Sequence, residues 1–167
     1  MPDKNFSYKD VIPSVIAGIF FISQMIYGFF YANNSQNDIL AYLGVLLFIL
    51  SGVFGMAPVF TFNKKGGVEK GKSYIHTTKI VDSGIYSILR HPQYSAFFLW
   101  AFAAMLLFQN TIVVLLGIPV IILTYYDMMR ADKVNIKKFG NPYKKYMKRV
   151  PRANFFLGIY RLLVKRK

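Results

Sequence analysis

The chain has no cysteine among its 167 residues, only 2 histidines, and 7 acidic residues against 21 Lys and Arg. The absence of cysteine excludes disulfides, thiolate nucleophiles and cysteine-ligated metal sites. The sequence also lacks a G-x-G-x-x-G turn after a strand and any alternation of strands with helices, which argues against a Rossmann nucleotide-binding domain. The shortage of acid leaves a formal net charge of +14.

Apolar residues are abundant, at 54% of the chain. A soluble domain of this size rarely combines so much apolar sequence with so large a basic excess. A membrane protein does, because apolar side chains face lipid while Lys and Arg gather beside anionic headgroups. Nucleic acid is not the expected partner, since most of the charge follows the last apolar run. The composition therefore predicts a membrane protein whose basic side contacts anionic lipids.

Four apolar runs predict an all-α, polytopic fold of about four transmembrane helices, in a single domain covering residues 1–167. The runs are residues 11–31, 39–62, 93–108 and 111–127. At a rise of about 1.5 Å per residue, the first two are long enough to cross a hydrocarbon core of about 30 Å. The third run is short for a span, and only Gln109-Asn110 joins it to the fourth.

The connections between these runs differ in charge, and the difference predicts the orientation. Residues 33–38 are polar and slightly acidic, whereas the segment between the second and third runs and the tail after Tyr126 are rich in Lys and Arg. The positive-inside bias places both basic segments on the cytosolic side. An even number of spans then predicts an integral membrane, multi-pass protein with both termini in the cytosol.

The basic tail is predicted to form three short helices. The first covers residues 131–139 and ends at Gly140. The second carries Tyr143 and Tyr146, three residues apart. In the third, residues 155–164, apolar side chains are interrupted by Arg161, a pattern typical of an amphipathic helix in the membrane interface.

A triplet before the third run carries the residues best suited to chemistry, Arg90, His91 and Pro92. An Arg side chain can hold a carboxylate with two hydrogen bonds, and His can donate, accept or titrate near neutrality. Pro92 suits the first turn of a helix. On these residues alone, an interfacial anchor in which Arg90 reaches lipid headgroups is an equally good interpretation.

Two sequence blocks extend this triplet. The first is Val81-Asp82-Ser83-Gly84-Ile85-Tyr86 followed by Arg90-His91-Pro92-Gln93-Tyr94, and the second is Phe139-Gly140 followed by Tyr143, Tyr146 and Val150-Pro151-Arg152. Together they resemble the cofactor signature of the isoprenylcysteine carboxyl methyltransferases and the related phospholipid methyltransferases. The resemblance covers residues 64–152, and its specificity comes from the order of the two blocks on either side of a helical hairpin.

The resemblance implies an integral membrane methyltransferase that uses S-adenosylmethionine without a Rossmann fold. The methyl acceptor would be lipophilic, enter from the bilayer, and carry a carboxylate, as isoprenylcysteine does, or else be a phospholipid amine. The implied cofactor region covers residues 76–94 and 127–152. By position, the implied cofactor contacts are His76, Ile80, Val81, Gly84, Ile85, Tyr86, His91, Pro92, Tyr94 and Asp132.

Four residues are the candidates for catalysis: Arg90, His91, Arg130 and Asp132. A carboxylate acceptor needs a cation to orient it, for which Arg90 or Arg130 is suitable. An amine acceptor must lose a proton, and His91 is the best available base. No metal site is predicted.

The family usually carries a Glu pair seven and eight residues before the Phe of its Phe-Gly, and this chain has Asp132 and Ala131 there. Asp132 therefore either takes the place of a glutamate beside the cofactor or caps a helix. Asp127 is a second candidate for the cofactor's carboxylate partner.

Two other functions stay open. A membrane reductase of the sterol or steroid type, using NADPH, has a similar Arg-His-Pro-x-Tyr turn. Those sequences typically place Asn before the Tyr and Gly-Glu soon after it, whereas this chain has Gln93 and then Ser95-Ala96. The other alternative is a non-catalytic four-span protein that binds anionic lipid through its basic tail.

Overall fold

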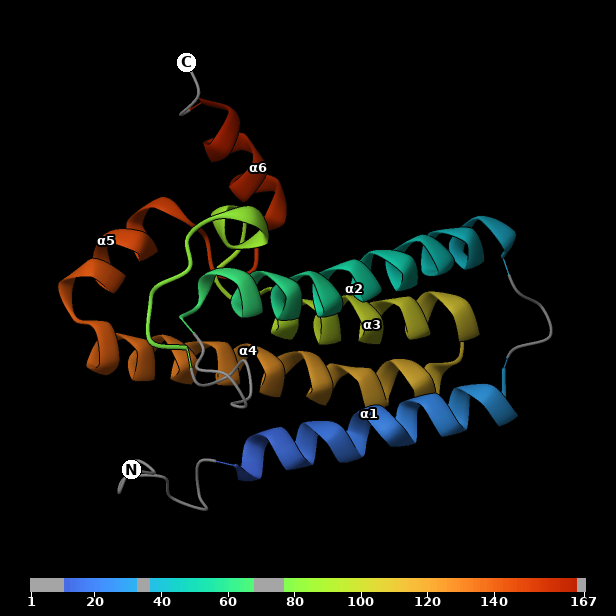
Figure 1. Ribbon diagram of the computed structural model, residues 1–167. Helices are drawn as coiled ribbons and strands as arrows, with labels where there is room; N and C mark the ends of the chain where they lie inside the picture. The colour runs from blue at the N-terminus through green and yellow to red at the C-terminus, as the bar shows by residue number, and fades with distance from the viewer. Residues whose placement is uncertain (1–10, 33–36, 68–76, 165–167) are drawn as a thin grey trace. The chain divides into compact units, whose positions relative to one another are not determined.

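The computed structural model describes residues 11–32, 37–67 and 77–164, and all regular structure in these residues is helical. In chain order the helices are α1 (Ile12–Phe30), α2 (Asp38–Lys65), the 3-10 helix η3 (Gly84–Ser87), α3 (Pro92–Phe108), α4 (Thr111–Phe139), α5 (Asn141–Arg149) and α6 (Phe155–Val164), as Figure 1 shows. The predicted all-α, polytopic fold is confirmed.

Three of these helices, α1, α2 and α4, are long and apolar enough to cross a membrane. The third apolar run forms α3, which has 17 residues and is therefore shorter, as its length in the sequence indicated. Helix α3 begins at Pro92, where the missing backbone N–H leaves no intrahelical hydrogen bond unmade.

One predicted helix boundary is wrong. Helix α4 runs without interruption from Thr111 to Phe139, whereas a break after residue 127 and a separate helix at 131–139 were expected. Neither Gly nor Pro occurs between Val120 and Phe139, so nothing interrupts the backbone hydrogen bonds there. The helix ends as predicted, because Gly140 has a φ of 61°, in the left-handed region that terminates helices.

The residues form two compact units. Unit 1 comprises Met1–Leu50 and Phe97–Asp127, and unit 2 comprises Ser51–Ala96 and Met128–Lys167. Helices α2, α3 and α4 each contribute residues to both units.

Unit 1 is a bundle in which small residues and a few polar contacts join the helices. Gln24 of α1 is fully buried, and its Nε2 donates to the backbone oxygens of Ala101 (3.1 Å) and Val113 (3.2 Å). Ser14 Oγ donates to Asp127 Oδ2 over 2.6 Å, which joins α1 to α4. The described residues of unit 1 contain neither Lys nor Arg.

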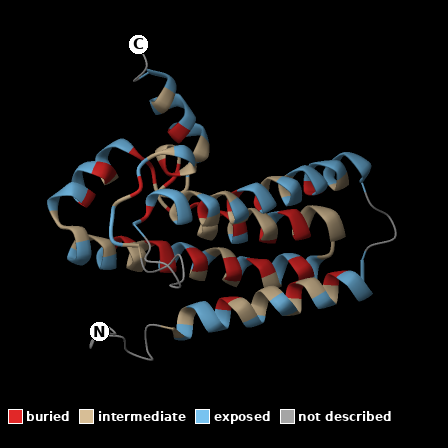
Figure 2. Cartoon of the chain, in the orientation of Figure 1, coloured by how far each residue is buried: buried red, intermediate tan, exposed pale blue. Residues whose placement is uncertain are grey.

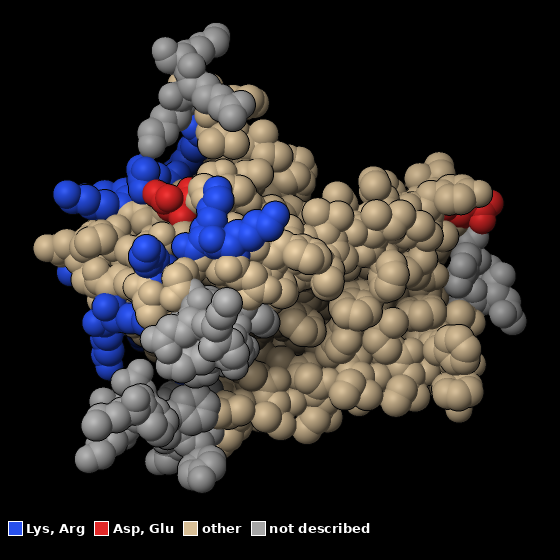
Figure 3. All heavy atoms as spheres, viewed as in Figure 1, with Lys and Arg blue, Asp and Glu red and all other residues tan. Residues whose placement is uncertain are grey.

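Unit 2 contains the basic residues. Every Lys and Arg that the structure describes belongs to it, and Figure 3 shows many of them around α5 and the segment that precedes η3. Its core holds Tyr143, Tyr146 and Val150. Ile80, Ile136, Phe139 and Met147 pack against this core, so residues 77–90, α4 and α5 all contribute to it. Figures 1 and 2 show these elements. The predicted second and third tail helices are thus present as α5 and α6.

Candidate functional site

A buried carboxylate, Asp132, lies at the centre of a polar cluster in unit 2. Its Oδ1 is 2.8 Å from His91 Nε2 and accepts a hydrogen bond from the Tyr143 hydroxyl, also at 2.8 Å. Its Oδ2 accepts from Arg90 Nη2 at 3.1 Å and from Arg152 Nε at 2.9 Å. Only 2% of the Asp132 surface is exposed, so these four partners replace water around the carboxylate.

This geometry defines what Asp132 can do. The residue lies inside α4, so the expected alternative role as a helix cap is wrong. A carboxylate has about four acceptor positions, and four protein groups already surround them. Since a carboxylate only accepts, His91 donates from a protonated Nε2. Asp132 therefore fixes the orientation of Arg90 and His91.

Arg90 is held at both ends of its guanidinium and still has a free donor. Nη1 donates to the backbone oxygen of Met147 at 3.0 Å, and Nη2 donates to Asp132. The side chain is only 7% exposed, yet Nε has no hydrogen-bond partner among the described residues. A buried N–H on a cation is costly when it has no acceptor, so this donor is suited to bind an acceptor atom of a ligand.

The cluster also brings two cations to one carboxylate. Two guanidinium groups, of Arg90 and Arg152, share the single carboxylate of Asp132. Guanidinium groups gathered in a largely buried site favour the binding of an anionic group.

Helix α5 and the residues that follow it bind the segment of residues 82–90, which carries Arg90. The Tyr146 hydroxyl donates to the backbone oxygen of Tyr86 at 2.7 Å, in η3. Arg90 N donates to the backbone oxygen of Pro151 at 3.0 Å, and the exposed Arg149 pairs with Asp82 at 3.1 Å. Through these contacts each of the two sequence blocks supplies one side of the site.

A cavity adjoins the cluster inside unit 2. The cavity is open to solvent on one side, and about 340 Å³ of space free of protein atoms lies in it when the open part is counted. Five aromatic side chains and two aliphatic ones account for most of its lining, and the remaining lining residues are polar or basic. The lining residues are Phe62, Thr77, Lys79, Ile80, Val81, Tyr86, Arg90, Asn135, Phe139, Tyr143 and Tyr146.

Two tyrosines of this cavity, Tyr143 and Tyr146, stay neutral. Burial raises the pKa of Tyr143 well above its ordinary value, and the negative charge of Asp132 raises it further. Burial likewise raises the pKa of Tyr146. Both phenols therefore keep their protons and act as hydrogen-bond donors, to Asp132 and to the Tyr86 backbone respectively. The aromatic rings lie close together, with the Phe62 and Tyr86 centroids 4.6 Å apart.

The predicted site residues line the cavity, belong to the polar cluster, or lie outside both. Ile80, Val81 and Tyr86 line the cavity together with Arg90. His91 and Asp132 belong to the polar cluster, and the Tyr94 ring stands edge-on to the His91 ring at 5.9 Å.

The other predicted residues lie outside both features. Gly84 and Ile85 form the start of η3, and Pro92 begins α3. Arg130 is half-buried on α4 and is not among the described residues that line the cavity. His76 lies outside the described residues. Asp127 belongs to unit 1, where it accepts a hydrogen bond from Ser14.

Several residues of the site were not predicted. Arg152 and Tyr143 bind Asp132, and Phe139, Tyr143 and Tyr146 line the cavity. The second sequence block contained all four of these, so the signal was present without a role being assigned. Phe62 had no comparable signal, because it only ended an apolar run. In the part of the chain that the structure describes, no group of three or more His, Asp or Glu side chains is placed to bind a metal.

Part of the chain is similar in sequence to known proteins. Residues 70–136 match the isoprenylcysteine carboxyl methyltransferase (ICMT) family, which confirms the resemblance to that family. The match includes Arg90, His91 and Asp132 and ends before the second sequence block. The resemblance to the related phospholipid methyltransferases stays a prediction.

Curated relatives carry the corresponding name. Protein-S-isoprenylcysteine O-methyltransferase B of Arabidopsis thaliana is 25% identical over 131 residues, which are 73% of this chain and 62% of the relative. The Schizosaccharomyces pombe protein-S-isoprenylcysteine O-methyltransferase is 30% identical over 93 residues, 50% of this chain and 39% of the relative. The human enzyme of that name is 29% identical over 125 residues, 73% of this chain and 43% of the relative.

The chain thus spans between 39% and 62% of the length of these relatives. No solved structure matches it. The family match and the three long apolar helices together identify an integral membrane protein.

Proposed function

We propose, from the match to the isoprenylcysteine carboxyl methyltransferase family, that this chain is a membrane methyltransferase. It would transfer a methyl group from S-adenosylmethionine to the carboxylate of a lipophilic acceptor such as isoprenylcysteine. The observation that carries the proposal is the Arg90 side chain, which lies within the matched residues, borders the cavity and keeps one buried donor unpaired.

The cavity of unit 2 suits this cofactor. S-adenosylmethionine combines an aromatic base, a sulfonium cation and an amino-acid carboxylate. Aromatic rings such as those of Phe62 and Tyr86 offer faces on which a base stacks and against which a sulfonium is attracted. The Nε–H of Arg90, which has no partner among the described residues, would hold the carboxylate.

When bound, S-adenosylmethionine supplies a methyl group that a carboxylate oxygen takes while the sulfonium becomes a neutral thioether. The chain's own residues act by positioning. Asp132 and the Met147 carbonyl fix the guanidinium of Arg90, and Tyr146 fixes η3 through the Tyr86 carbonyl. The apolar rings exclude water, which favours a reaction that removes charge.

The cluster supports a carboxylate acceptor over an amine. An amine must lose a proton before it attacks, and His91 was the expected base. His91 Nε2 is directed at Asp132, and His91 is not among the described residues that line the cavity. A carboxylate acceptor needs no base, so the arrangement of His91 supports O-methylation.

The acceptor would reach the site from the bilayer, and anionic lipids at the cytosolic face would be the second class of partner. The proposed orientation keeps both termini in the cytosol. It is supported by the distribution of charge, because the described Lys and Arg residues all belong to unit 2, which also contains the proposed site.

The test is a methyl-transfer assay in detergent or nanodiscs with radiolabelled S-adenosylmethionine. The acceptor would be a prenylated cysteine with a free carboxyl group, compared with the same compound as its amide. We expect a product from the free acid alone, and that product should release volatile methanol in base, as a methyl ester does. A base-stable product from a phospholipid amine would replace O-methylation by N-methylation. Binding of NADPH without binding of S-adenosylmethionine would instead support a reductase.

A further inference from the structure

We propose that the outward face of α6 docks on the surface of a membrane that contains anionic lipid, and that this docking is transmitted to Arg90 and His91. The docking itself is independent of the proposed function. Its consequence for the cofactor rests on that function.

Helix α6 has two apolar faces, and only one of them is covered by unit 2. On the covered face, the Phe155 ring lies 6.2 Å from the Phe54 ring and Gly158 is buried. The other face carries Phe156, Ile159, Tyr160 and Leu163, which follow the i, i+3, i+4, i+7 spacing of a single helix face. Phe156 is 73% exposed and Tyr160 is 63% exposed, and Figure 2 shows most of α6 in the exposed class.

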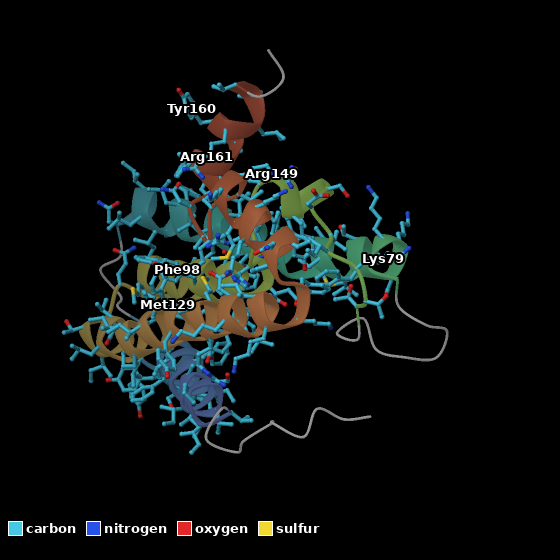
Figure 4. All side chains as sticks on the ribbon, turned by 90° about the vertical axis from the view of Figure 1, so that its left-hand side faces the viewer. Lys79, Phe98, Met129, Arg149, Tyr160 and Arg161 are labelled. Atoms are coloured by element: carbon cyan, nitrogen blue, oxygen red, sulfur yellow. The ribbon has the colours of Figure 1, made fainter. Side chains whose placement is uncertain are left out.

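The charges around this face determine which occupant it fits. Arg161 on α6 donates to the backbone oxygen of Lys148 at 3.4 Å, so it lies against the end of α5. Figure 4 shows Arg161 and Tyr160 on α6 with Arg149 at the end of α5. Lys148, Arg149 and Arg161 are all exposed. An apolar helix face flanked by exposed cations is the pattern of a helix that lies in a lipid headgroup layer.

The opposite charge is nearly absent from the described part of unit 2. Apart from the buried Asp132, its only described acid is Asp82, which already pairs with Arg149 at 3.1 Å. A second copy of the chain placed on this face would bring Arg161 and its neighbours against the same cations. Anionic headgroups supply the missing negative charge, so the charge pattern favours a membrane surface over self-association.

The covered face of α6 is tightly seated. A Cβ atom at position 158 would overlap the backbone oxygen of Ile88, so only glycine allows this approach. Ile88 immediately precedes Leu89, which is 1% exposed, and Arg90. The backbone N–H of Arg90 also bonds to Pro151, in the connection that leads to α6. A shift of α6 would therefore move the segment that positions Arg90 and His91.

The docking can be tested without any cofactor. Because the chain contains no cysteine, a single cysteine at Tyr160 (Y160C) can carry an environment-sensitive fluorophore. Labelled protein would be placed in nanodiscs of phosphatidylcholine alone or with phosphatidylglycerol, each with and without a lipid that carries a nitroxide quencher. Lys144→Cys, exposed on α5, is the matched control.

In the anionic nanodiscs we expect the emission of the label at position 160 to shift to shorter wavelength and to be quenched more strongly by the nitroxide lipid. The label at position 144 should show the emission typical of water in both kinds of nanodisc. Equal, water-like emission at both positions in both lipids would overturn the proposal. Energy transfer between donor- and acceptor-labelled copies at position 160, without quenching by lipid, would overturn it in favour of self-association.

The coupling between docking of α6 and the site at Arg90 is measured separately, as the rise in melting temperature that S-adenosylhomocysteine causes. We expect a larger shift in anionic than in neutral nanodiscs, and Gly158→Ala should remove that difference by displacing α6. Lipid quenching at position 160 combined with equal thermal shifts in both lipids would refute the coupling and leave the docking. No thermal shift in either lipid would count against the proposed function instead.

Discussion

Unit 1 and unit 2 are held together by different interactions, although α2, α3 and α4 supply residues to both. In unit 1 the described polar contacts between helices are few and neutral donors make them, as with Gln24 and Ser14. In unit 2 a buried carboxylate binds two guanidinium groups, an imidazole and a phenol.

The difference separates scaffold from site. Helices in lipid gain little from burying apolar surface, so they associate through close packing at small residues, which is what Gly28, Gly44 and Gly117 of unit 1 provide. A buried ion cluster is a poor way to gain stability, because desolvation offsets much of the attraction. Its presence in unit 2 is better explained by the need to hold Arg90 in one orientation. The comparison makes four predictions, from the largest effect to the smallest.

The first prediction concerns Asp132→Asn. The change removes the negative charge shared by Arg90 and Arg152, so both cations lose their ion pair with Asp132. Breaking a buried ion pair from one side costs about 3–5 kcal/mol. We expect the free energy of unfolding to fall by that order, as measured by thermal unfolding of the detergent-solubilised protein.

Asp82→Asn is the matched control for this variant. It removes a carboxylate from an ion pair whose side chains are about half exposed, and such pairs contribute less than about 1 kcal/mol. If both variants lost the same amount of stability, the buried cluster around Asp132 would contribute no more than an exposed ion pair, and the prediction would be wrong.

The second prediction concerns Tyr143→Phe, which removes the hydroxyl that donates to Asp132. A hydrogen bond to a charged group contributes about 1.5–3 kcal/mol to stability. We expect the free energy of unfolding to fall by an amount within that range, measured by thermal unfolding.

The pH dependence of this variant gives an independent check. Because the pKa of Tyr143 is raised on folding, its contribution is complete below the ordinary phenol value of about 10 and declines as the pH rises further. The stability gap between the wild type and Tyr143→Phe should therefore narrow above that pH. A gap that widens there would show that the phenol is not the donor to Asp132.

The third prediction tests packing in unit 1 through Gly44→Ala. A Cβ at position 44 would lie 2.8 Å from Leu107 Cγ and 3.1 Å from the backbone oxygen of Ala103, so α2 and α3 would have to separate. Overpacking of this kind costs about 1–3 kcal/mol. Gly18→Ala meets nothing within 4 Å and should be neutral or slightly stabilising. The comparison fails if the two alanines behave alike in thermal unfolding.

The smallest effect is expected for Gln24→Leu. The variant loses two hydrogen bonds to carbonyl oxygens, but it also removes an Oε1 that has no partner among the described residues. Interhelical hydrogen bonds in membranes average about 0.6 kcal/mol, so we expect a change in unfolding free energy of that size. A loss as large as that of Asp132→Asn would show that unit 1, too, depends on a polar contact.

Much of the fold could be predicted, because long apolar runs bounded by polar residues leave few alternatives to helices. The error in α4 has a simple cause. After Tyr126 the sequence changes from apolar to charged, and that change in polarity was interpreted as the end of a helix. Polarity reports the surroundings of a helix, whereas only Gly, Pro or a cap ends it, and the next such residue is Gly140.

The site was predictable in part for a different reason. Arg90, His91 and Asp132 were identified through a resemblance, and the structure brings them together. The contacts that Asp132 makes were not predictable, because Arg90 is 42 residues away and Arg152 is 20 residues away along the chain. Contacts over such separations depend on how α5 packs against residues 77–90, which local sequence patterns do not contain.

The central claim is that the cavity beside Arg90 binds S-adenosylmethionine, and calorimetric titration with its demethylated product, S-adenosylhomocysteine, tests it most directly. The titration would compare the wild type with Arg90→Lys, which lacks the Nε donor geometry, and with Arg149→Lys, which alters an exposed ion pair of unit 2. We predict binding to the wild type and to Arg149→Lys, and a loss of affinity for Arg90→Lys. Equal affinity for all three folded proteins, or no binding to the wild type, would contradict the claim.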